Sequence, residues 1–78
     1  MDKFLLLQRL SLVHAQAEAA HLETVMSSQL VTQLENDGRD PSAAKLQLRT
    51  WEMTEQKLLR ELDWILDKLD RDAPAEGP

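Results

Sequence analysis

The sequence predicts an all-α fold, a long antiparallel two-helix hairpin of the coiled-coil type. Three observations indicate this fold class. Two segments of nearly equal length carry apolar residues at helical spacing, a short segment of turn-forming residues divides them, and neither segment has an internal Gly or Pro. We expect one domain, residues 1–72, followed by a disordered tail, residues 73–78.

The first helix is expected over residues 3–35. Apolar or small residues recur there at alternating steps of four and three, which places them on one face, as in the seam of a coiled coil. The segment is rich in Leu, Ala, Gln and Glu, which favour helices. The expected seam consists of Leu6, Leu10, Val13, Ala17, Ala20, Thr24, Ser27, Val31 and Leu34.

A turn is expected at residues 36–40. Gly38 can adopt the left-handed conformation that commonly follows a helix C-terminus. Asp40 is expected to cap the second helix, and Pro41 suits its first position, where no backbone N–H is needed. Because the connection is short, the two helices must be antiparallel neighbours.

The second helix is expected over about residues 41–71, because the tail from Ala73 onward contains two Pro residues and one Gly. Its seam again follows steps of three and four: Ala44, Leu48, Trp51, Glu55, Leu58, Leu62, Ile65 and Leu69. Folding the chain about the turn places Ala20 opposite Leu58, and small residues of the first helix generally face large residues of the second. Close packing requires this complementarity.

A further set of apolar residues lies outside the seam and has no third layer to cover it. An exposed apolar strip of this length is typical of an interface. The simplest cover is a second copy related by a two-fold axis, which would form a homodimeric four-helix bundle. The expected dimer interface comprises Leu5, Leu12, Ala19, Leu22, Met26, Leu59 and Leu66.

Composition narrows the classes of partner and chemistry. With 14 acidic and 9 basic side chains the net charge is −5, which disfavours nucleic acid and anionic membranes as partners. The first apolar run ends at Gln8, too early for a signal peptide or membrane span, so we expect a cytoplasmic protein. The absence of Cys excludes disulfides, thiolate catalysis and cysteine zinc sites.

The middle of the chain carries a specific pattern around the turn. Residues 30–44 read Leu-Val-Thr-Gln-Leu-Glu-Asn-Asp-Gly-Arg-Asp-Pro-Ser-Ala-Ala, and Leu48 and the pair Trp51-Glu52 follow. This pattern resembles a group of small uncharacterised bacterial proteins, which are short helical hairpins with a Leu-Glu-x-Asp-Gly-x-Asp turn. The resemblance covers about residues 30–62. It implies the hairpin fold and carries no activity.

Three potential metal ligands share one face of the first helix. His14, Glu18 and His21 follow one another at steps of four and three, and two such sets in a dimer could hold a divalent transition metal. This face lies beside the seam, however, whereas metal sites of helical bundles point into the interior. We therefore favour a solvated face and expect no bound metal or other cofactor.

Trp64 is the best candidate for contact with a partner protein. It lies off the seam, with Arg60 and Lys68 one helical turn to either side. An exposed Trp with neighbouring cations is typical of interface hot spots. The alternative is a solvated ring stacked on those two cations.

Glu55 is the one charged residue of the second seam. We expect it to face Thr24 and Ser27 in a polar layer that fixes the register of the hairpin. No acid, base or nucleophile is expected beside it, so this layer does not indicate catalysis.

The motifs of common enzyme classes are missing from the sequence. There is no Gly-rich phosphate loop, no nucleophile with a matching base and no zinc signature. We therefore predict a non-enzymatic protein interaction or assembly module that acts as a homodimeric helical bundle. A second hypothesis remains open, a small four-helix bundle that binds a metal or an apolar ligand through the histidine face or the small-residue midsection.

Overall fold

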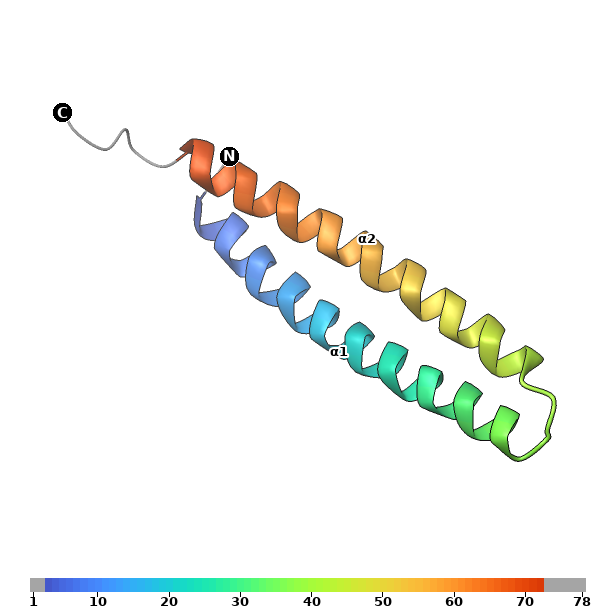
Figure 1. The fold of residues 1–78 in the computed structure, drawn as a ribbon. Coiled ribbons are helices and arrows are strands. Elements are labelled where there is room, and N and C mark those ends of the chain that lie inside the picture. Colours follow the sequence, from blue (N-terminus) through green and yellow to red (C-terminus); the bar gives the residue numbers. More distant parts are fainter. Residues whose placement is uncertain (1–2, 73–78) are drawn as a thin grey trace.

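The computed structural model describes residues 3–72, which form two antiparallel helices lying side by side (Figure 1). Helix α1 spans Lys3–Asn36 and helix α2 spans Ser42–Asp72. The molecule measures 65 × 20 × 13 Å, so it is a single layer of two helices. The predicted all-α architecture with two packed helices is confirmed. The expected tail at residues 73–78 lies outside the described residues.

The turn is built from backbone hydrogen bonds that close the end of α1. The N–H of Arg39 donates to the carbonyl of Leu34 at 2.8 Å, and the N–H of Gly38 donates to the carbonyl of Glu35 at 3.1 Å. This pair of bonds is a Schellman motif, which requires a left-handed residue just after the helix. Gly38 supplies it with a φ of 71°. The predicted stop of the first helix therefore has its expected cause.

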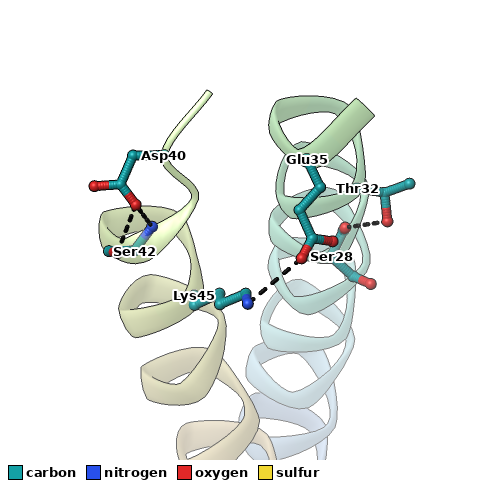
Figure 2. Close-up of polar contacts among 6 residues, drawn as sticks. All are labelled: Ser28, Thr32, Glu35, Asp40, Ser42 and Lys45. Carbon is teal, nitrogen blue, oxygen red and sulfur yellow. Dashed lines mark hydrogen bonds and ion pairs between the residues drawn. The ribbon is translucent and has the colours of Figure 1, made fainter. Parts of the chain in front are cut away.

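Helix α2 begins with a side-chain cap (Figure 2). Oδ1 of Asp40 accepts hydrogen bonds from the backbone N–H of Ser42 at 3.0 Å and from its hydroxyl at 2.6 Å. The N–H of Lys45 donates to the carbonyl of Pro41 at 2.8 Å, so helical bonding starts at Pro41. The hydroxyl of Ser42, followed by its N–H and the charge of Lys45, lowers the pKa of the Asp40 carboxyl.

One ion pair connects the two helices next to the turn. Nζ of Lys45 lies 3.4 Å from Oε2 of Glu35 (Figure 2). Both side chains are more than half exposed, so the pair contributes little to stability. It does show which sides of α1 and α2 share one edge of the hairpin.

The seam contains the core of the hairpin. Every residue that the sequence placed in either seam is buried or half-buried. Val13 and Ile65 are the largest side chains with no more than 1% exposure, and Leu6 completes their cluster. The half-buried residues packed against this cluster are Leu10, Leu58, Leu62 and Leu69. The best-packed part of the core is therefore at the end farthest from the turn.

Many large apolar side chains remain exposed on the described part of the chain. On α1 they are Phe4, Leu5, Leu7, Leu12, Leu22, Val25, Met26 and Leu30; on α2 they are Leu46, Met53, Leu59, Trp64 and Leu66. Within residues 3–72 neither helix has a stretch apolar enough to cross a membrane. The exposed apolar side chains of both helices make the surface of this two-helix layer unusually apolar.

Candidate interaction surfaces

The two-helix layer has two long flanks, and each flank contains one side of both helices. We define the Trp64 flank by two hollows between the helices, one lined by Leu5, Leu6, Arg9, Glu61 and Trp64, the other by residues that include Gln16, Ala19, Glu23, Thr54 and Leu58. We define the His21 flank by a groove lined by His14, Ala17, Glu18, His21, Leu22, Glu55, Leu59 and Leu62. The Glu35–Lys45 pair lies on the His21 flank by the helical repeat, since Glu35 follows His21 by two heptads.

On the Trp64 flank an ion pair connects the helices beside the indole ring. Nε of Arg9 donates to Oε1 of Glu61 at 2.8 Å, and Nη2 of Arg9 approaches the same oxygen. Trp64 is 49% exposed and shares its hollow with Leu5 and both members of this pair. The hollow has a volume of about 460 Å³. A half-exposed Trp beside an apolar hollow is a suitable anchor for another protein surface.

The cations around Trp64 differ in part from those that the sequence suggested. Arg60 is exposed and Lys68 is half-buried, and neither lines the hollow beside Trp64. The cation in that hollow is Arg9, which comes from the other helix. In the register that places Ala20 opposite Leu58, Arg9 lies level with Leu69 rather than with Glu61, so the sequence pattern did not point to this pair.

The groove on the His21 flank is lined by both apolar and polar side chains. Its volume is about 470 Å³, and its apolar lining is formed by Ala17, Leu22, Leu59 and Leu62. In its polar lining, Nδ1 of His21 lies 3.0 Å from Oε2 of Glu55, whose side chain is 21% exposed. A second pair brings Nε2 of His14 to 3.6 Å from Oε1 of Glu18. The groove exists because Ala17 leaves space between the larger leucines.

The expected surroundings of Glu55 were wrong. Its partner is His21 rather than Thr24 or Ser27, so a titratable base does lie in its layer. The hydroxyl of Thr24 instead donates to the carbonyl of Ala20 in its own helix at 2.9 Å. The longer imidazole reaches from beside the seam to the half-buried carboxylate, whereas the short Thr side chain finds its acceptor locally.

The three potential metal ligands of α1 do not converge on one point. His14 pairs with Glu18, and His21 pairs with Glu55 across the hairpin. Within residues 3–72 no group of three or more His, Cys, Asp or Glu side chains is arranged to hold a metal ion.

The seven expected interface residues are not brought together on one face. Leu22 and Leu59 share the groove of the His21 flank, and Leu66 follows Leu59 by one heptad. Leu5 and Ala19 line hollows of the Trp64 flank, and Leu12 and Met26 lie one heptad to either side of Ala19. The structure thus provides two apolar flanks where the sequence suggested one strip.

Comparisons of this chain with protein-family models, with curated proteins and with solved structures found no match. The resemblance of residues 30–62 to small bacterial helical hairpins therefore stays a prediction.

Proposed function

We propose that this chain is a non-enzymatic assembly module that associates with itself, and that its smallest assembly is a four-helix bundle of two copies. One observation supports this proposal most strongly. Large apolar side chains line both flanks of a layer whose own core fully buries few large side chains. A second hairpin placed against a flank would supply the missing second layer.

The energies favour assembly over a free hairpin. A domain of this size obtains only about 3–5 kcal/mol from a single core. Burying one Leu that is otherwise exposed contributes about 1.5–3 kcal/mol. Because each flank presents several such residues, covering one flank can match the stability of the hairpin itself. Assembly and folding are therefore expected to be coupled.

The direct test is the mass of the native chain in solution. Light scattering after size exclusion, over a wide concentration range, should give at least twice the chain mass of 8.9 kDa. The thermal midpoint should rise with protein concentration, because association stabilises the folded state. A cooperatively folded chain that stays monomeric throughout would contradict the proposal.

Trp64 is the proposed anchor of such contacts, either between copies or with another protein. We expect Trp64→Ala to leave helicity intact and to weaken association about tenfold or more, since hot-spot Trp residues contribute about 2 kcal/mol or more. Met53→Ala is the matched control, because Met53 is 64% exposed and lines none of the flank hollows described above. Unchanged association of the Trp64 variant would show that the ring is merely solvated.

A second candidate function follows from the groove of the His21 flank. A groove lined by apolar, His and Glu side chains could bind a small apolar molecule or, in an assembly, a metal. Thermal unfolding with added nickel or zinc should show no specific stabilisation if the chain is only an assembly module. Stoichiometric binding that is lost in both His14→Ala and His21→Ala would favour this second function.

A further inference from the structure

The two flanks carry opposite charge. On the Trp64 flank, Arg9 pairs with Glu61, and further charges are placed there by the heptad repeat. Lys57 and Arg71 each lie seven residues from Trp64, and Lys68 lies seven residues from Glu61, so all three lie on the same side of α2 as the residues of this flank. Arg71 is paired with Asp67, Nε to Oδ2 at 3.1 Å. With Glu23 in the second hollow, this flank has four cations and three carboxylates: Arg9, Lys57, Lys68, Arg71, Glu23, Glu61 and Asp67.

The His21 flank is acidic. Glu18 and Glu55 line its groove, and Glu35 and Lys45 pair at its turn end. The helical repeat places two more carboxylates on this flank. Glu52 precedes Leu59 by one heptad, and Asp63 follows Leu59 by four residues, the spacing at which Glu18 follows His14 in the same groove. The same repeat places Asp70 and Arg49 on this flank. The His21 flank therefore carries six carboxylates and two cations, Lys45 and Arg49. The carboxylates are Glu18, Glu35, Glu52, Glu55, Asp63 and Asp70.

We propose that a second copy of this chain docks its acidic His21 flank onto the basic Trp64 flank. This proposal rests on the proposed self-association and specifies its mode. Both flanks are apolar along α1, so apolar burial alone would allow any pairing of flanks. Charge distinguishes them, because pairing two Trp64 flanks opposes cations to cations and pairing two His21 flanks opposes carboxylates to carboxylates.

The distribution of charge along α2 also sets the direction of stacking. Lys68 lies in the half of α2 away from the turn, and so do Asp63 and Asp70 on the other flank, whereas Lys57 is the central residue of the helix. In copies that point the same way, Lys68 lies between the levels of these two aspartates. In copies that point opposite ways, Lys68 meets the turn half instead, where Lys45 is already paired with Glu35 and where Arg49 lies. The stack therefore keeps all turns at one end.

A contact between unlike flanks leaves one flank of each kind free on every pair. Such a heterologous contact continues to add copies unless its rotation closes a ring. Neither Lys57 nor Lys68, nor Asp63 nor Asp70, forms an ion pair within the described chain, so all four charges are available to a neighbouring copy. The assembly should therefore grow with concentration beyond two copies.

The test uses charge reversal on one flank at a time. Lys57→Glu with Lys68→Glu makes the Trp64 flank acidic, and Asp63→Lys with Asp70→Lys makes the His21 flank basic. Each double variant alone should associate at least tenfold more weakly than the native chain, as measured by sedimentation, because its flanks then repel. An equimolar mixture should recover association, because each altered flank finds an opposite one.

A matched control and two contrary outcomes complete the experiment. The control is Arg39→Glu with Arg60→Glu, which replaces two cations by carboxylates as the lysine double variant does. Arg39 lies in the turn, and Arg60 lines none of the flank hollows. This control should associate as the native chain does. If one flank variant alone associates with native affinity, the contact joins like flanks and the present inference is wrong. If the native chain is monomeric, the proposed function fails as well.

Cross-linking gives an independent readout, because the native chain has no Cys. In a same-direction stack, Ala19 on the Trp64 flank of one copy lies level with Glu18 on the His21 flank of the next. Mixed Ala19→Cys and Glu18→Cys chains should form a disulfide-linked heterodimer faster than either chain forms a homodimer. Faster formation of an Ala19→Cys homodimer would indicate contact between two Trp64 flanks and overturn the proposal.

Discussion

Helices α1 and α2 have similar lengths but use their apolar residues differently. Helix α1 buries mainly small or β-branched side chains, while eight of its large apolar residues are exposed. Its charges are sparse: Lys3, Arg9, Glu18, Glu23 and Glu35. Helix α2 concentrates its apolar residues on one face, where Leu58, Leu62 and Ile65 pack against α1, and charged residues occupy much of the rest.

This difference separates two roles within one hairpin. The large seam residues of α2 need the small residues of α1 opposite them, so the seam determines whether the hairpin forms. The outer surface of α1 is apolar without being needed for that seam, so in the proposed assembly it supplies much of the apolar contact area, beside Trp64 of α2. Substitutions in the α2 seam should therefore act on folding, and substitutions on the outside of α1 should act on association.

The largest effect is expected for Ile65→Ala. Ile65 has no exposed surface and belongs to the core cluster with Val13 and Leu6. Truncation of a buried Ile to Ala costs about 2–5 kcal/mol, which approaches the whole stability of a domain this small. Circular dichroism should show a largely unfolded chain or a strongly lowered urea midpoint.

Leu46→Ala is the control for that truncation on the same helix. Leu46 is 70% exposed, so its loss should leave the urea midpoint nearly unchanged. Equal destabilisation by both variants would show that α2 is not divided into a packed seam and a solvated surface.

The next effect is expected where α1 must stay small. Ala20 is 2% exposed and faces the Leu58 region, so Ala20→Leu should overpack the seam and cost about 1–3 kcal/mol. Glu18→Leu, at an exposed position, should be nearly neutral for folding. Urea titration of both variants checks the assignment, and the reverse order would mean that the seam follows another stripe.

A smaller effect, on association rather than folding, is expected on the outer surface of α1. Leu12→Gln and Leu22→Gln each remove one exposed apolar residue, one from each flank. Each should weaken association by about tenfold, or about 1.4 kcal/mol, with helicity retained. Met53→Gln alters an exposed residue that lines none of the flank hollows described above and should have no effect on sedimentation. An equal loss there would show that the flanks are not the surfaces of association.

The smallest effect concerns the Asp40 cap at the start of α2. Because the bonds from Ser42 lower the pKa of Asp40 below its ordinary value of 3.8, the carboxylate stabilises the fold at neutral pH. That contribution is lost as pH falls through the lowered pKa. Asp40→Ala should therefore be less stable than the native chain at neutral pH, with the difference vanishing in acid.

Urea midpoints measured across the acid range check this prediction. Asp37→Ala is the control, because the Asp37 carboxylate forms no hydrogen bond or ion pair among the described residues. If the urea midpoints of the native chain and Asp40→Ala differ by the same amount in acid as at neutral pH, then the charge of the Asp40 carboxylate does not contribute to the cap.

The elements and the seam were predictable from local rules. The four-three spacing identified the inner faces of both helices, and Gly38, Asp40 and Pro41 specified the turn through their own backbone preferences. The pairing of small α1 residues with large α2 residues was enough to set the register. The helices and the turn depend on local preferences, and the short turn leaves few registers in which small residues of one helix can face large residues of the other, which is why one sequence sufficed.

The flanks were not predictable in the same way. A heptad repeat places a residue on one side of its own helix, but which side of the other helix shares that flank depends on how both helices are rotated about their axes. Hence the expected interface residues were grouped together although Leu5 and Leu59 lie on different flanks. The His21–Glu55 and Arg9–Glu61 pairs were missed because long side chains reach across the seam.

The position of the Gly38 turn has a consequence for how quickly the hairpin can form. Cross-helix pairs occur at rising sequence separation: Glu35 with Lys45 near the turn, His21 with Glu55 at 34 residues, and Arg9 with Glu61 at 52 residues. Closing the most distant pair directly costs about 1.5 kcal/mol more chain entropy than closing the nearest. Closure from the turn outward avoids that cost, because each formed pair shortens the next loop. Substitutions near Ala44 should then slow refolding, whereas those at Ile65 should mainly speed unfolding, as stopped-flow kinetics can measure.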